Sequence, residues 1–202
     1  MAWSPDSEYL AFVRFDESEV PEYSMQMYGE GLYPGYYEYK YPKAGQKNSK
    51  VSVHSYSVVT KDTKEMKVPV EGDFYIPRIT FTQNPDQLAI MTLNRQQNVF
   101  NMYYANPKSG VFRLILREEN KCYVDSDWLT SIQFLNNGFT YVSEQDGYSH
   151  IYLYSPTGVM QRQVTQGTGM SRSSWAWMRI RRLSITSLPR KARSAVLSIR
   201  SS

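Results

Sequence analysis

The sequence predicts an all-β protein built from consecutive hairpins. In residues 1–168, short runs rich in Val, Ile, Tyr, Phe and Thr alternate with polar positions, which is the pattern of half-buried strands. No stretch of these residues has a clear helical period. Clusters of Asn, Pro, Asp and Gly separate the runs, and these residue types favour tight turns.

The expected strands are spread over the whole of residues 1–168. In chain order they are 9–15, 51–59, 65–68, 75–81, 88–93, 99–105, 112–116, 139–143, 150–154 and 159–164. Several of them are separated by turn signals, which lie at 106–110, 136–138, 146–147 and 155–158.

A short unit recurs along the chain: an aromatic residue, a tight polar turn and then an apolar strand. The copies begin at Trp3, at Phe81 and, more weakly, at Phe134. Repeats of about 40–50 residues with four short strands each are typical of β-propeller blades. The aromatic residue of each copy is expected to fill the space between adjacent sheets.

We therefore expect a partial β-propeller of about three four-stranded blades. The blades would cover residues 1–70, 71–120 and 121–168, followed by an irregular tail at 169–202.

The long first repeat indicates an insertion at residues 20–45. Among its prolines and glycines stand Tyr23, Tyr28, Tyr33, Tyr36, Tyr37, Tyr39 and Tyr41. Tyrosine can bury its ring while its hydroxyl stays in water, which suits a protruding interface arm. The alternative is a loop folded back on its own blade.

The charge is divided unevenly along the chain. The 202 residues carry a formal net charge of +4 and a pI of about 9.0, which would suit nucleic acid or an anionic membrane as a partner. Residues 1–168, however, hold 15 basic and all 19 acidic residues, whereas 169–202 hold eight basic residues and no acid. The basic character therefore belongs to the tail and not to the β-rich body.

Composition excludes two classes for the chain. A hydrophobic content of 41%, with 14% aromatic residues, is too apolar for a disordered protein. No apolar run reaches the length of about 18 residues that a transmembrane helix needs.

The single cysteine, Cys122, cannot form an internal disulfide, and we expect it to be a small, half-buried structural residue. Residues 1–6 contain no signal segment and are expected to lie inside a longer sequence.

Four stretches, in order, carry a family resemblance. They are Trp-Ser-Pro-Asp at 3–6 with Phe15, Glu19, Val20 and Pro21; Tyr-Pro-Lys-Ala-Gly at 41–45 with Asn48; Tyr-Ile-Pro-Arg-Ile at 75–79 with Leu-Asn-Arg-Gln-Gln-Asn at 93–98; and Ser-Glu-Gln-Asp-Gly-Tyr-Ser-His-Ile-Tyr-Leu-Tyr at 143–154. Together they resemble the N-terminal propeller of the dipeptidyl peptidase IV family, which are prolyl oligopeptidase-type serine peptidases.

The resemblance implies a propeller that caps an α/β-hydrolase domain, which carries a Ser-Asp-His triad. A pair of propeller glutamates would bind the α-amino group of the peptide substrate, and dipeptides would leave from the N-terminus, often after Pro or Ala. It further implies a homodimer through the arm at 20–45 and a periplasmic, outer-envelope or secreted location. Cofactors, metals and nucleic acid are not expected.

The chain departs from the family pattern at the substrate-binding and catalytic residues. The family's glutamate pair lies just upstream of the Trp-Ser-Pro turn, before Met1, and no stretch matches the hydrolase domain. We therefore expect a fragment without catalytic, substrate-binding or metal-binding residues. The acidic pair Glu118-Glu119 stands in another blade and is expected to be a solvated turn. Residues 169–173 fail the Gly-x-Ser-x-Gly pattern because Ser173 replaces the second glycine.

Five other polar residues are expected to be structural. His54 and His150 lie in strand patterns and should be partly buried. Arg78, Arg95 and Asp146 are candidates for ion pairs or turns.

Two interpretations of the tail remain open. It is rich in Ser and Arg and contains Trp175 and Trp177, so it could bind phosphates or an anionic membrane surface. Alternatively, it is encoded in a shifted frame. Permitted codons for residues 168–194 can be read in another frame as WDVTKFLGMDADTKTFYYVSAEESPF, which contains two alternating strands like those with which the family continues. On that hypothesis the tail has no selected function.

The favoured hypothesis is thus a truncated, non-catalytic piece of such a peptidase. One rival is a non-enzymatic β-propeller interaction module whose basic tail binds nucleic acid or membrane. A second rival is a peptidase assembled with a separately encoded hydrolase chain. Because an open array of blades leaves sheet edges unpaired, marginal stability or aggregation is expected.

Overall fold

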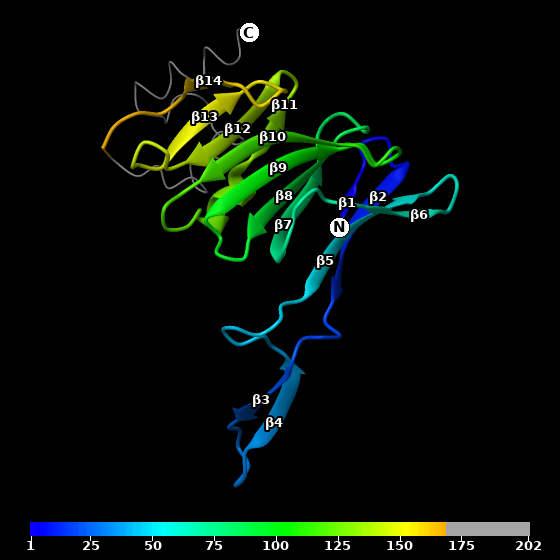
Figure 1. Ribbon diagram of the computed structural model, residues 1–202, viewed down its shortest axis with the longest axis vertical. Helices are drawn as coiled ribbons and strands as arrows, with labels where there is room; N and C mark the ends of the chain where they lie inside the picture. The colour runs from blue at the N-terminus through cyan, green and yellow to red at the C-terminus, as the bar shows by residue number, and fades with distance from the viewer. Residues whose placement is uncertain (169–202) are drawn as a thin grey trace.

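The computed structural model describes residues 1–168, which form three adjacent sheets and a two-stranded ribbon that extends away from them (Figure 1). Each of the three sheets has four antiparallel strands, and the only helix in residues 1–168 is the short 3-10 helix η1 (Ser126–Ser131). The predicted all-β partial propeller with a protruding arm is confirmed. The predicted irregular tail, 169–202, lies outside the described residues.

The first sheet has the strand order β1-β2-β5-β6. Its opening turn closes because the Asp6 carboxylate accepts a hydrogen bond from the Ser4 hydroxyl at 2.5 Å, and that hydroxyl accepts one from the Tyr9 N–H at 2.9 Å. β2 and β5 pair without a break, and the arm leaves and returns at one end of this pair. The strands are β1 (Ala2–Trp3), β2 (Tyr9–Asp16), β5 (Lys50–Ser57) and β6 (Thr63–Met66).

The second sheet is a meander whose two central strands are buried on both faces. Leu88 and Ile90 of β8 pack into one apolar cluster with Ala11 of the first sheet, whereas Met91 packs into a second cluster with Phe139 of the third sheet. This alternation follows the pleat of the strand. The strands are β7 (Phe74–Phe81), β8 (Leu88–Asn94), β9 (Val99–Ala105) and β10 (Phe112–Glu119).

The third sheet is also a meander, and two glycines permit its close turns. A Cβ on Gly138, at φ 147°, would lie 2.0 Å from the Tyr154 carbonyl oxygen, and one on Gly158, at φ 87°, would lie 1.8 Å from the Ile115 carbonyl oxygen of β10. Gly158 therefore lets the third sheet approach the second. The strands are β11 (Gln133–Leu135), β12 (Gly138–Ser143), β13 (His150–Tyr154) and β14 (Met160–Gln163).

Two expectations about single residues are wrong. Phe81 is buried between sheets and Phe134 packs against the second cluster, but Trp3 is 55% exposed because no other sheet among the described residues covers it. Cys122 is exposed and not half-buried, since it lies in the loop between β10 and η1. Four further strands were not predicted, namely β1, β3, β4 and β11.

Candidate functional site: the inserted arm

The arm is a hairpin that stands clear of the sheets. β3 (Glu22–Met27) pairs with β4 (Gly35–Lys40), and Figure 1 shows this hairpin extending away from the three sheets. The alternative expectation, a loop folded back on the first blade, is therefore wrong. An isolated two-stranded hairpin is at best marginally stable in water, so this arrangement calls for further contacts.

One face of the hairpin is apolar and aromatic. Tyr23 lies opposite Tyr39, Met25 opposite Tyr37, and Met27 opposite Gly35, and facing residues of an antiparallel pair share one side. The tyrosine rings pack along this side, with centroids 5.8 Å apart for Tyr23 and Tyr39 and 5.4 Å apart for Tyr37 and Tyr39. We call Tyr23, Met25, Met27, Tyr37, Tyr39 and Tyr41 the aromatic face.

The opposite face of the hairpin is largely polar. Glu22 and Lys40 form an ion pair at 3.1 Å, and the next positions along β3 and β4 on this side are Ser24 and Glu38. Tyr36 is the aromatic exception on this side. The ribbon is therefore amphipathic, although no sheet of the described chain covers its aromatic face.

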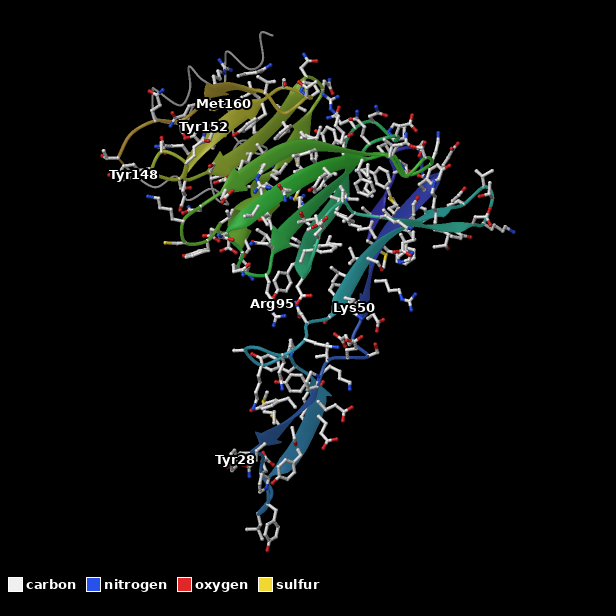
Figure 2. The ribbon with its side chains drawn as sticks, viewed as in Figure 1. Tyr28, Lys50, Arg95, Tyr148, Tyr152 and Met160 are labelled. Carbon is white, nitrogen blue, oxygen red and sulfur yellow. The ribbon has the colours of Figure 1, made fainter. Side chains whose placement is uncertain are left out.

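The tip and the aromatic face together expose a large apolar surface. Tyr28 at the tip is 81% exposed and lies far from the sheets in Figure 2, and Leu32 and Tyr33 are 98% and 88% exposed. On the aromatic face, Met27 and Tyr37 are 52% and 61% exposed. Exposed apolar patches of this kind mark protein or membrane contacts, and aromatic and Met side chains are enriched at protein interfaces.

The acidic pair Glu118-Glu119 differs from the expected solvated turn. Both residues belong to β10, because their backbones pair with Phe100 and Val99. The Glu118 carboxylate is half-buried and accepts a hydrogen bond from the Ser143 hydroxyl at 2.8 Å, while Glu119 is exposed and pairs with Arg117 at 3.2 Å. Burial raises the pKa of Glu118 above its ordinary value.

Ser143 and His150 stand opposite each other on β12 and β13, close to Glu118, but they do not form a nucleophile–base pair. The His150 Nε2 lies 3.0 Å from the Gly167 carbonyl oxygen, and its Nδ1 lies 3.3 Å from the Thr165 hydroxyl. Both ring nitrogens thus have structural partners, and the Ser143 hydroxyl donates to Glu118. A Ser–His nucleophile pair needs the hydroxyl within hydrogen-bond reach of the imidazole, whereas here the Ser143 hydroxyl is directed to the Glu118 carboxylate.

The other predicted structural residues lie apart from one another. His54 is half-buried and stacks on Phe12 with centroids 5.3 Å apart. Arg78 donates to the Leu129 and Thr130 carbonyl oxygens at the end of η1, at 3.1 and 2.9 Å. Asp146 accepts a hydrogen bond from Gln163 at 2.7 Å. The described residues contain no group of three or more His, Cys, Asp or Glu side chains placed to hold a metal ion.

The architecture defines a class of protein: consecutive antiparallel four-stranded blades with an arm inserted in the first blade, as in a β-propeller. The family model described as "Dipeptidyl peptidase IV (DPP IV) N-terminal region" matches residues 1–183. The chain belongs to this family. Within residues 1–168, no helix is long and apolar enough to cross a membrane.

Relatives with established names support the assignment. Dipeptidyl peptidase 4 of Arthroderma otae is 30% identical over 183 residues, which cover 82% of this chain and 23% of the relative. The probable dipeptidyl-aminopeptidase B of Phaeosphaeria nodorum is 28% identical over 182 residues, which cover 76% of this chain and 20% of the relative. The chain thus spans about a quarter of the length of the curated relatives or less.

Solved structures agree with the sequence relatives. The crystal structure of Porphyromonas gingivalis dipeptidyl peptidase 4 matches with a TM-score of 0.77 and 59% identity, over 83% of this chain and 24% of that one. The structure of a putative dipeptidyl aminopeptidase IV from Bacteroides ovatus matches with a TM-score of 0.69 and 26% identity, over 82% of this chain and 26% of that one.

Proposed function

We propose that this chain is part of the propeller of a serine exopeptidase that releases dipeptides from the N-termini of peptides, often after Pro or Ala. Membership of the dipeptidyl peptidase IV N-terminal family carries this proposal. Within that peptidase, the chain contributes a scaffold and an interface arm, and the chain is not catalytic on its own. The proposed setting is periplasmic, outer-envelope or secreted.

The surroundings of Ser143 support the non-catalytic part of the proposal, because its hydroxyl donates to Glu118 and both ring nitrogens of His150 have other partners. Ser52 Oγ lies 3.0 Å from His54 Nε2, so Ser52→Ala serves as a second variant beside Ser143→Ala. The test is hydrolysis of Gly-Pro-p-nitroanilide by the purified 202-residue chain, with P. gingivalis dipeptidyl peptidase 4 as the positive control. We expect no p-nitroaniline above the buffer blank. Release of p-nitroaniline that a Ser143→Ala or Ser52→Ala variant abolishes would overturn the proposal.

We further propose that the arm joins two copies of this chain into a homodimer. None of the six residues of the aromatic face is charged, and the Lys43 ammonium lies over Tyr23 at the root end of the face. The Met and Tyr side chains nearer the tip can therefore pack against a second copy without burying an unpaired charge. Pairing would also supply the contacts that a lone hairpin lacks. Sedimentation equilibrium of the full chain tests this: a monomer–dimer equilibrium is expected, and a monomer at all concentrations would contradict it.

The tail is proposed to be the product of a frameshift near Thr168. The lack of acidic residues after Thr168 supports this, whereas the family match continues to residue 183. Sequencing the gene decides the question, because codons incompatible with the shifted reading would eliminate it. The eight basic residues of the tail favour the rival function, an interaction module, and salt-dependent DNA or vesicle binding that deletion of 169–202 abolishes would support that rival.

A further inference from the structure

The arm joins the sheets through a short root made of two chain segments. The outgoing segment follows β2 and contains Glu19, and the returning segment precedes β5 and contains Lys47. The Glu19 carboxylate contacts the Lys47 ammonium at 2.5 Å and the Lys50 ammonium at 2.6 Å. The Tyr41 N–H donates to the Pro21 carbonyl oxygen at 3.0 Å. These contacts hold the two segments to each other, but none of them reaches the second sheet.

The Arg95 side chain connects the arm to the second sheet through hydrogen bonds. Arg95 lies in the turn between β8 and β9, and Figure 2 shows it in the region where the arm meets the sheets. One guanidinium nitrogen donates to the Asp73 carboxylate at 2.7 Å, and the other donates to the Gln46 carbonyl oxygen at 2.6 Å. Asp73 directly precedes β7, so Arg95 and Asp73 both belong to the second sheet's side of the junction.

The Gln46 carbonyl belongs to a closed turn that also contacts the aromatic face. The Gln46 N–H donates to the Lys43 carbonyl oxygen at 3.0 Å, and the Lys43 N–H donates to the Gln46 side-chain oxygen at 2.9 Å. The Lys43 ammonium lies 4.9 Å from the centre of the Tyr23 ring. A continuous set of contacts therefore runs from the second sheet, through Arg95 and this turn, to the arm's tyrosines.

We propose that Arg95 is a positioning residue that fixes the direction of the arm relative to the second sheet. Its planar guanidinium can bind a carboxylate and a carbonyl at once, which a lysine ammonium cannot do in the same fixed geometry. The Arg95 side chain is 34% exposed, whereas Lys47 and Lys50 are 73% and 66% exposed and their ion pairs are more strongly screened by salt. The consequence for assembly rests on the proposed homodimer, but the positioning itself concerns a single chain.

The test measures the direction of the arm directly. Spin labels are attached at Glu38→Cys on the arm's polar face and at Arg113→Cys on β10 of the second sheet, in the Cys122→Ser background. The labelled chain is diluted with unlabelled chain so that only distances within one molecule are recorded by pulsed electron resonance. We expect a single narrow distance distribution that Arg95→Gln broadens at least about twofold, with Arg95→Lys intermediate.

The matched control is Arg117→Gln, which removes an arginine ion pair on the outer strand β10 of the second sheet. It should leave the distribution unchanged, and Asp73→Asn, which removes the carboxylate partner of Arg95, should broaden it. Equal widths for Arg95→Gln, Asp73→Asn and Arg117→Gln would overturn the proposal. Sedimentation of the wild-type chain decides the homodimer separately, so failure of one proposal is distinguishable from failure of the other.

Discussion

The second sheet and the arm have the same local structure but opposite surroundings. β8 and β9 are covered on both faces by apolar clusters from the neighbouring sheets, whereas β3 and β4 have a fully formed aromatic face that no sheet of the described residues covers. A strand pair in the second sheet is therefore stabilised within the chain. The arm has an apolar, aromatic face like that of a buried strand pair, but no sheet of the described residues packs on it, and the proposed homodimer would supply that contact.

The largest expected difference between the second sheet and the arm is the loss of stability when a large ring is removed from each. Phe100 of β9 is 0% exposed and stacks on Tyr141 of β12 with centroids 5.6 Å apart. Phe100→Ala should lower the free energy of unfolding by about 3–5 kcal/mol, because it leaves a cavity between two sheets. Tyr37→Ala in the arm should change it by less than about 0.5 kcal/mol in the monomer. Urea denaturation measures both values.

A milder substitution in the second sheet gives a measurable value even if Phe100→Ala does not fold. Ile90→Val, at another fully buried position of the second sheet, should cost about 0.5–1.5 kcal/mol. Equal effects in the arm and the second sheet would contradict the contrast between them.

The next effect concerns the contact between the second and third sheets. Gly158 and Gly147 have similar backbone angles, φ 87° and 91°, but a Cβ on Gly158 would collide with the Ile115 carbonyl and one on Gly147 would meet nothing within 4 Å. Backbone strain should lower the free energy of unfolding of both alanine variants by about 1 kcal/mol or more. Gly158→Ala should cost about 1–3 kcal/mol in addition. Thermal unfolding of the two variants side by side measures the difference, and equal losses would show that this approach adds no stability.

A substitution on the aromatic face tests what the arm contacts. Tyr37→Lys should weaken self-association about tenfold or more, because it would bury a charge at the centre of the proposed interface. Gln26→Lys places the same charge on the polar face and should change the dissociation constant by less than about threefold. Sedimentation equilibrium measures both constants. Similar weakening by the two variants would show that charge, and not the aromatic face, controls association.

The smallest effects are pH dependences of opposite sign. Glu118 has its pKa raised by burial, so its protonation favours the folded state, and wild type should gain stability relative to Glu118→Gln as the pH falls from 7 towards 4.5. At the arm root, hydrogen bonds from Lys47 and Lys50 lower the pKa of Glu19 to about 2. Wild type should therefore lose stability relative to Glu19→Gln only as the pH falls below 4.5. Urea denaturation across this range checks both signs, and a shared direction would contradict the assigned environments.

The sequence predicted the blades well because their strands carry local signals. Apolar runs bounded by polar turn residues specify β8, β9, β12 and β13 with errors of one residue or less at their ends. β1 and β11 have two and three residues, too few to show a period. β3 and β4 do alternate, from Tyr23 to Met27 and from Tyr37 to Tyr41, but their Gly- and Pro-rich surroundings favoured an irregular insertion.

The contacts that shape the candidate site could not be read from the sequence. The tyrosines pointed to an interface arm, but Met25 and Met27 join the aromatic face only through the register with β4. Glu19 pairs with Lys47 and Lys50 at the arm root, and Arg95 donates to the backbone carbonyl of Gln46 in the returning segment. Contacts between residues so far apart in the chain follow no spacing rule, since tertiary structure alone brings them together.

Hydrogen exchange of the full chain at two protein concentrations tests the contrast between the second sheet and the arm most directly. Backbone amides of β8 and β9 should exchange slowly at both concentrations, while those of β3 and β4 should exchange quickly in dilute solution and slowly in concentrated solution. Arm amides as slow as those of β8 in dilute solution would contradict the claim that the chain leaves the arm uncovered. Arm amides that stay fast at every concentration would contradict the claim that a second copy covers it.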